Sequence, residues 1–273
     1  MSLMVRDVCS IMEKFAPKIL SESYDNVGLM VGNLEENVSS ILVALDCTLE
    51  VIEEAKEKNC NFILTHHPLL FHKPSSITSE TLVGKKIIQL IKNDICLYSS
   101  HTNLDSVSGG VNDALTKLLG YKKFRVLETT HVKEFQSSNA GIGRIVKLEK
   151  EQTLESILLK VKDRLKIKNL RYVGDESMPI NTIAIVNGSG SDYLEVCQKQ
   201  GVDCVVTGDI TYHYASDYNE SRMAIIDAGH FATEWLPLVE VSNRIGLEIS
   251  KLGHKNDILI SQSTQNPYKY KTK

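Results

Sequence analysis

Apolar runs and a helical pattern alternate in the first half of the chain. Residues 41–46 (ILVALD) and 60–67 (CNFILTHH) are rich in apolar and β-branched side chains, which predicts two buried strands. Residues 49–59 (LEVIEEAKEKN), between them, carry apolar side chains at helical spacing. A strand, a helix and a strand in succession predict a crossover connection, which makes the two strands parallel.

The second half of the chain repeats this order. Residues 182–187 (TIAIVN) predict a strand, residues 193–201 (YLEVCQKQG) a helix, and residues 202–209 (VDCVVTGD) another strand. In both halves the second strand ends in a threonine, Thr65 or Thr207, just before residues that suit a turn. The likeness predicts an internal duplication.

A further apolar strand in each half leads into a histidine with a carboxylate four residues later. The two sequences are ICLYSSHTNLD, with His101 and Asp105, and MAIIDAGHFATE, with His230 and Glu234. One such pattern alone would carry little information. Its recurrence at corresponding places of a duplicated chain indicates a shared function.

These patterns predict an α/β protein with two related lobes, in which mixed sheets are flanked by helices and a metal cleft lies between the lobes. The N-terminal lobe is expected at residues 1–125 and the C-terminal lobe at 126–273, with the terminal segments able to pack on the opposite lobe. Residues 122–180 predict a hairpin and a helix rather than a free linker, because no segment rich in Gly, Ser or Pro separates the halves.

The composition is that of an ordinary globular protein. The chain has 273 residues, of which 42% are hydrophobic and 24% charged, and a formal net charge of −3 that provides no basic field for a nucleic acid. No apolar stretch approaches the roughly 20 residues of a membrane span, and acidic residues near the N-terminus argue against a signal or transit peptide. Six scattered cysteines without a CxxC pair predict reduced thiols and a cytoplasmic location.

The chemically active side chains fall where strands of a parallel sheet end, and such sheets bind ligands at the carboxyl ends of their strands. His66 and His67 directly precede Pro68, where the backbone turns and both rings can flank one cleft. Each histidine–carboxylate pair needs one helical turn to bring both side chains to one face. The residues expected together are His66, His67, Asp105, His230 and Glu234, with His101 nearby.

Three imidazoles and two carboxylates predict a metal centre. These donors suit borderline divalent ions such as Zn²⁺, Fe²⁺, Mn²⁺, Co²⁺ or Ni²⁺. Five ligands exceed what one open catalytic ion needs, and they suit two ions that share a bridging carboxylate, for which Glu234 is the candidate.

Other candidate groups surround this set. Gly188 and Gly190, in the loop NGSGSD, either contact a phosphate through their backbone or form a plain tight turn. Asp209 and His213, at the duplicate of the histidine strand end, are candidates for acid/base groups, for partners that orient a ligand, or for a structural role. His101 is a candidate metal ligand, orienting residue, proton shuttle or helix cap.

At these residues the chain resembles the GTP cyclohydrolase 1 type 2 homologues, also described as NIF-three-like dinuclear metal-centre proteins. The resemblance implies a two-lobed α/β subunit, a dinuclear metal site and a toroidal homohexamer. Carried over residue by residue, the metal ligands of the family fall on the five positions already named. At this length no room is expected for the extra domain that longer members insert. The matching segments are SESYDNVGLMVG (21–32), LTHHPLLF (64–71), SSHTNLDSVSGGVNDAL (99–115), NGSGSDYL (187–194), TGDITYHYA (207–215) and DAGHFATEW (227–235).

Two classes of function follow from these residues. The first is a metal-dependent hydrolase that acts on a nucleotide or phosphoester-type small molecule, with His101, Asp209 or His213 moving protons. The second is a non-catalytic protein that binds or delivers metal through the same ligands. The sequence supplies the ligands to both.

Overall fold

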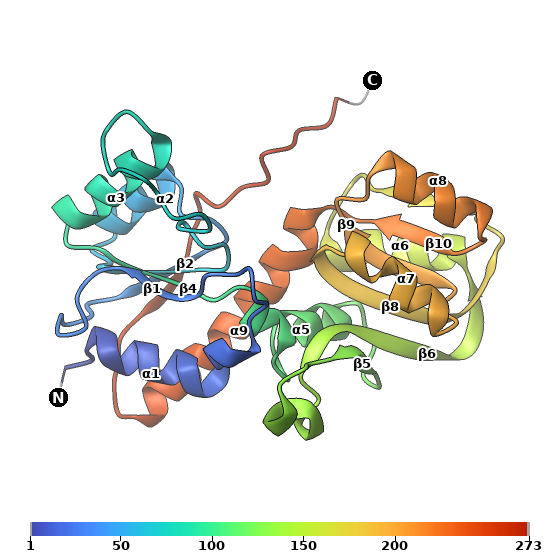
Figure 1. Ribbon diagram of the computed structural model, residues 1–273, viewed down its shortest axis with the longest axis horizontal. Coiled ribbons are helices and arrows are strands. Elements are labelled where there is room, and N and C mark those ends of the chain that lie inside the picture. Colours follow the sequence, from blue (N-terminus) through green and yellow to red (C-terminus); the bar gives the residue numbers. More distant parts are fainter. Residues whose placement is uncertain (1, 272–273) are drawn as a thin grey trace. The chain divides into compact units, whose positions relative to one another are not determined.

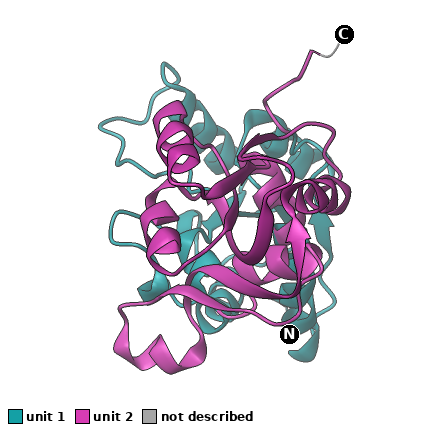
Figure 2. Cartoon of the chain, turned by 90° about the vertical axis from the view of Figure 1, so that its right-hand side faces the viewer, with its two compact units in different colours: residues 1–107, 238–265 teal, residues 108–237, 266–273 magenta. Residues whose placement is uncertain are grey.

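The computed structural model describes residues 2–271 and divides them into two compact units (Figure 2). Unit 1 takes in the residues up to Val107 together with Leu238–Gln265, and unit 2 takes in Ser108–Pro237 together with the residues from Asn266 onward. The two predicted lobes, with their boundary after residue 125, are defined by sequence repeats, and that division stays a prediction.

Unit 1 is built on a five-stranded sheet in the order β1-β4-β3-β2-β11. Strands β2, β3, β4 and β11 run parallel, and β1 is added antiparallel to β4 at one edge. The strands are β1 (Gly28–Val31), β2 (Ile41–Ala44), β3 (Phe62–Thr65), β4 (Cys96–Ser99) and β11 (Ile258–Ile260).

Helices cover both faces of this sheet (Figure 1). α2 (Leu49–Glu57) and α3 (Leu82–Lys92) pack on one face, where Ile52 and Leu90 join the apolar cluster of the strands. α1 (Val5–Phe15) and the second part of α9 (His230–Lys251) cover the other face. The short elements are η1 (Lys18–Leu20) and α4 (Thr102–Ser106).

Unit 2 is built on a six-stranded sheet in the order β5-β6-β8-β9-β10-β7. Strands β8, β9 and β10 run parallel, and β7 is antiparallel to β10. The strands are β5 (Arg125–Thr129), β6 (Gly141–Thr153), β7 (Arg171–Val173), β8 (Pro179–Ser189), β9 (Cys204–Gly208) and β10 (Ala224–Asp227).

The helices of unit 2 also pack on both faces of its sheet. Apolar side chains of α5 (Val111–Leu118) and α6 (Leu154–Leu165) form the core on one face. Those of α7 (Leu194–Lys199) and α8 (Tyr212–Glu220) form the core on the other. Two short 3-10 helices, η2 (Lys133–Ser138) and η3 (Ser191–Tyr193), complete the unit.

The two sheets share a strand order. Three parallel strands with an antiparallel strand at one edge occur as β2-β3-β4-β1 in unit 1 and as β8-β9-β10-β7 in unit 2. This repetition is the one that the duplicated sequence pattern predicts, so the predicted class of mixed α/β sheets with flanking helices is confirmed.

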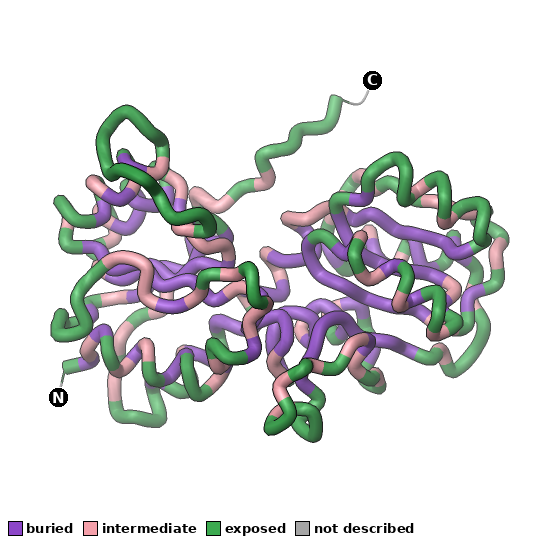
Figure 3. The backbone as a smooth tube through the Cα atoms, in the orientation of Figure 1, coloured by how far each residue is buried: buried purple, intermediate pink, exposed green. Residues whose placement is uncertain are grey.

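The burial of the parallel strands explains why they appear in the sequence as continuous apolar runs. Every residue of β2, β3, β4, β9 and β10 is buried, because helices cover both faces (Figure 3). No helix within residues 2–271 is long and apolar enough to span a bilayer.

A buried ion pair joins α5 to β6 inside unit 2. The Arg144 side chain is fully buried, and its Nε lies 2.5 Å from Oδ1 of Asp113. Arg144 Nη1 donates to the carbonyl oxygens of Gly141 and Gly143, each at 2.8 Å, and Asp113 Oδ2 accepts from the Gly109 N–H. The pair therefore fixes the start of α5 against the sheet.

We expect Asp113→Ala to lower the free energy of unfolding by about 3–5 kcal/mol, because it leaves the Arg144 guanidinium buried without its counter-ion. The matched control is Asp163→Ala, which removes exposed ion pairs with Arg164 and Lys166 and should cost less than about 1 kcal/mol. Chemical denaturation of both variants measures the difference, and equal losses would contradict the prediction.

Candidate metal centre

A tight turn after β3 presents His66 and His67. The hydroxyl of Thr65 donates to the carbonyl oxygen of His67 at 3.0 Å and contacts the hydroxyl of Ser99 at 2.8 Å. His66 is fully buried, whereas His67 is partly exposed. Because the backbone leaves the strand here, two adjacent side chains gather on one side instead of alternating across the sheet.

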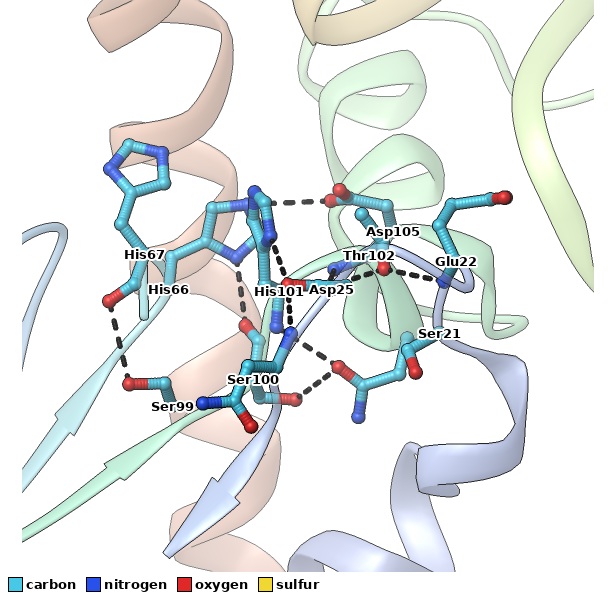
Figure 4. A network of polar contacts seen from close by, with 12 residues as sticks. Ser21, Glu22, Asp25, His66, His67, Ser99, Ser100, His101, Thr102 and Asp105 are labelled. Atoms are coloured by element: carbon cyan, nitrogen blue, oxygen red, sulfur yellow. Dashed lines mark hydrogen bonds and ion pairs between the residues drawn. The ribbon is translucent and has the colours of Figure 1, made fainter. Parts of the chain in front are cut away.

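Three imidazole rings of unit 1 lie together (Figure 4). The ring centroids are 5.3 Å apart for His66 and His67, 5.1 Å for His66 and His101, and 5.6 Å for His67 and His101. One nitrogen of each ring lies within 4.8 Å of one nitrogen of both others. Nitrogen donors at this spacing are close enough to bind a common divalent ion.

An oxygen atom lies at Nδ1 of each of these three rings. His66 Nδ1 is 2.9 Å from the carbonyl oxygen of Ser100, and His67 Nδ1 is 2.8 Å from Oδ1 of Asp46. A carbonyl oxygen only accepts hydrogen bonds, so the His66 proton resides on Nδ1 and Nε2 carries the lone pair. This is the arrangement of a metal-binding histidine whose second nitrogen is fixed by an acceptor.

Asp25 holds His101 and the start of α4. Its Oδ1 is 3.0 Å from His101 Nδ1, and its Oδ2 accepts from the backbone N–H of Thr102 at 3.0 Å and from the hydroxyl of the same residue. Burial alone would raise the pKa of the Asp25 carboxyl, but the hydrogen bonds from His101 and Thr102 outweigh it and hold the pKa at about 2. His101 occupies the N-cap position of α4, yet its side chain makes no capping hydrogen bond.

Asp105, on α4, faces the same cluster. Its Oδ1 lies 3.5 Å from Nε2 of His66, and the residue is 7% exposed. Unit 1 thus brings together all the site residues that the sequence predicts within it: His66, His67, His101 and Asp105.

The predicted residues of unit 2 form a second cluster. His230 begins α9 directly after β10, and Glu234 follows one helical turn later, with its Oε2 3.0 Å from His230 Nε2. Asp209, which follows β9, places Oδ2 2.9 Å from His230 Nδ1. Asn187 donates from Nδ2 to Oε1 of Glu234 at 3.2 Å, and the Glu234 side chain is 3% exposed.

Each cluster contains an imidazole nitrogen facing a carboxylate oxygen. His66 Nε2 faces Asp105, and His230 Nε2 faces Glu234. With Nδ1 carrying the proton, such a contact would place two electron pairs against each other, which a proton or a cation between them relieves. Imidazole nitrogen and carboxylate oxygen are also the donors that borderline divalent ions prefer, so the residues present fit a metal centre.

Gly188 lies where a side chain cannot fit. A Cβ atom added there would be 2.2 Å from Oε1 of Glu234, and its φ of +60° also favours glycine. Its N–H donates to the Thr233 hydroxyl at 3.0 Å. A Cβ atom at Gly190 would be 2.4 Å from Oγ1 of Thr207. Close packing explains both glycines, and their contact with a phosphate stays a prediction.

His213 lies exposed on α8, where its ring contacts that of Tyr212 at a centroid distance of 5.7 Å. Asp209 has a left-handed backbone conformation, with φ of +55°, and holds His230. The geometry therefore gives Asp209 a positioning role, and the predicted acid/base roles of Asp209 and His213 stay predictions.

Comparison with known proteins places this arrangement in a family. The family model described as Duf34/NIF3 (NGG1p interacting factor 3) matches residues 3–267. The chain belongs to the Duf34/NIF3 family.

Relatives of this family align along their whole length. A GTP cyclohydrolase 1 type 2 homolog of Clostridium acetobutylicum is 54% identical, covering 99% of this chain and 100% of the relative. One of Clostridium perfringens is 50% identical, covering 97% and 99%. Among solved structures, a hypothetical protein of Staphylococcus aureus has a TM-score of 0.90 at 30% identity, covering 99% and 100%. A Bacillus cereus protein related to NIF3 has a TM-score of 0.91 at 25% identity, covering 99% and 100%.

In this Duf34/NIF3 chain, Asp209 was a predicted orienting residue, whereas Asp46, Asp25 and the Ser100 carbonyl were not predicted. Asp46 ends the run ILVALD and follows β2, so the rule that selected His66 at a strand end could also have selected it. Asp25 lies in a loop before β1 and gave no signal of its own, although it falls inside a segment shared with the family. The Ser100 carbonyl is a backbone group, which every residue has, so no sequence pattern predicts its contact with His66.

The contacts predict the tautomer of His66. We expect its neutral ring to carry the proton on Nδ1, because the facing carbonyl oxygen of Ser100 cannot donate. Nitrogen-15 NMR spectroscopy of histidine-labelled protein distinguishes the two tautomers by the shifts of Nδ1 and Nε2. Exposed His131 serves as the reference. A proton on Nε2 of neutral His66 would contradict the assignment.

Proposed function

We propose that this protein binds two divalent transition-metal ions (Zn²⁺, Fe²⁺, Mn²⁺, Co²⁺ or Ni²⁺) and hydrolyses a nucleotide or phosphoester-type substrate with them. The proposed ligands are His66, His67, Asp105, His230 and Glu234. The observation that carries the proposal is that an oxygen atom lies at Nδ1 of each proposed histidine ligand. These oxygens come from Ser100 at His66, from Asp46 at His67 and from Asp209 at His230. Each contact leaves Nε2 of the ring available to a metal ion.

The carboxylates support the same proposal. Glu234 is nearly fully buried, and a buried carboxylate is costly unless it is paired or coordinates a cation. The Asn187 amide donates a hydrogen bond to Oε1 of Glu234, and His230 Nε2 faces Oε2. A carboxylate held in this way is fixed in orientation and available as a metal ligand.

The chemistry would be hydrolytic. Bound ions of this class activate water near neutral pH and polarise a phosphoryl or carbon centre. His101 is the residue best placed to move a proton, because the Asp25 carboxylate orients its ring and the ring lies beside those of His66 and His67. The names of the relatives point to a nucleotide as the first substrate class to test.

Metal analysis of purified variants tests the ligand set. Wild-type protein should carry about two ions per chain. Glu234→Gln keeps the size of the side chain but removes its charge, so we expect less than about one ion per chain if it bridges both. His101→Ala should retain most of the metal, because His101 is proposed to act outside the ligand set.

Exposed His131 provides the matched control, and His131→Ala should retain both ions. Elemental analysis by mass spectrometry, on protein purified without added metal or chelator, gives the stoichiometry. Full occupancy in Glu234→Gln, or loss of an ion in His101→Ala, would overturn the assignment.

Turnover is a separate test. Metal-loaded protein should hydrolyse at least one member of a panel of nucleotides and phosphodiesters, and His101→Ala should lower kcat by about 10²-fold or more while metal content is kept. Absence of metal-dependent turnover across the panel, with both ions bound, would favour a metal-binding or metal-delivery protein that uses the same ligands.

Family membership and composition support a proposal for assembly and location. We propose a toroidal homohexamer in the cytoplasm, and the six cysteines, which form no disulfide, agree with that compartment. Light scattering coupled to size exclusion should give about six times the 30.5 kDa chain mass. A stable monomer at micromolar concentration would refute the hexamer.

A further inference from the structure

Unit 2 contains a cavity remote from the residues discussed so far. Its volume is about 470 Å³, which lies within the usual range for small-molecule sites. The regular pairing of β6 with β8 is interrupted here, because Lys147 pairs with Thr182 whereas Gln152 already pairs with Ile180. Residues 148–151 therefore form a bulge in β6, and three of them, Leu148, Glu149 and Lys150, line the cavity.

The cavity is strongly cationic. Five lysines and one acidic residue, Glu149, line it, so its formal charge is +4 in a chain whose net charge is −3. Among the described residues none of these lysines forms an ion pair, whereas Lys117, Arg164, Lys166 and Lys199 of the same unit do. The lysines are Lys122, Lys123, Lys147, Lys150 and Lys160.

The inner wall is apolar. Val146 and Tyr121 are buried, and Lys160 extends over the ring of Tyr121 with its Nζ 3.9 Å from the ring centroid. Burial, followed by the charge of Arg164, lowers the pKa of the Lys160 ammonium. An anion in the cavity would relieve both effects.

The cavity lies at the opposite end of the sheet from His230 and Glu234. Lys147 pairs with Thr182 near the start of β8, whereas Asn187, which contacts Glu234, lies near its end. Five residues of strand separate Thr182 from Asn187, which corresponds to about 16 Å. A ligand bound here would not contact the proposed metal ligands of this unit.

We propose that this cavity binds a small organic molecule carrying two phosphate groups. Each phosphate monoester contributes a charge of about −1.5 to −2 at neutral pH, so two of them match the net charge of the lining. The size of the cavity suits one metabolite-sized molecule rather than a polymer, and the apolar wall provides a surface for its carbon skeleton.

Binding of fructose 1,6-bisphosphate, a bisphosphate that binds divalent ions weakly, tests the proposal by calorimetry on the full chain. Lys147→Gln/Lys150→Gln should weaken binding about tenfold or more through loss of two charge-assisted contacts. The matched control, Lys133→Gln/Lys168→Gln, removes two exposed lysines that do not line the cavity and should change binding less than about twofold. Glu234→Gln should bind as wild type does, which separates this cavity from the proposed metal centre.

Three results would overturn the proposal. One is the absence of binding by the wild-type protein at millimolar bisphosphate. A second is an equal loss of bisphosphate affinity in the two double lysine variants, which would indicate general charge attraction alone. The third is equally tight binding of inorganic phosphate, which would exclude a two-phosphate ligand. Circular dichroism of each variant checks that the fold is retained.

Discussion

Three parallel strands that end at one edge of a sheet are the constraint on which the chemistry of both units depends. Parallel strands place their carboxyl ends at the same edge of the sheet, so the residues that follow these strands lie close together. In unit 1 this brings Asp46 to His67 and His66 to His101, from three strand ends. In unit 2 it brings Asp209 to His230. The helices on both faces bury the strands, which keeps these ends fixed.

Orientation of the histidines follows from the same geometry. His67 is held by an aspartate from the neighbouring strand end, and His230 is held by one in the same way, although the two pairs come from different halves of the duplicated chain. A carboxylate or carbonyl at Nδ1 removes the freedom of the ring to present either nitrogen. Both units thus orient an imidazole through an aspartate at the end of the neighbouring strand. The strands that carry the aspartate and the histidine do not correspond between the two units.

The candidate metal ligands and the lysine-lined cavity occupy opposite ends of the sheet in unit 2. Carboxylates and imidazoles lie where β8, β9 and β10 end, and the lysine-lined cavity lies beside the start of β8. The cavity lies beside the bulge in β6, where residues 148–151 interrupt the regular pairing with β8. One fold therefore provides two chemically distinct surfaces on a single chain.

The sequence by itself located the central strands and the principal candidate site residues. Apolar runs located β2, β3 and β9 because strands buried on both faces leave no polar alternation, and the repeated histidine–carboxylate pattern located His230 with Glu234 because one helical turn is a local relation. Only the tertiary structure decided that Asp46 orients His67, that Asp25 orients His101 and that Arg144 pairs with Asp113. The contacts of Asp25 with His101 and of Arg144 with Asp113 join residues 76 and 31 positions apart, and such pairing depends on how sheets and helices pack rather than on any local pattern.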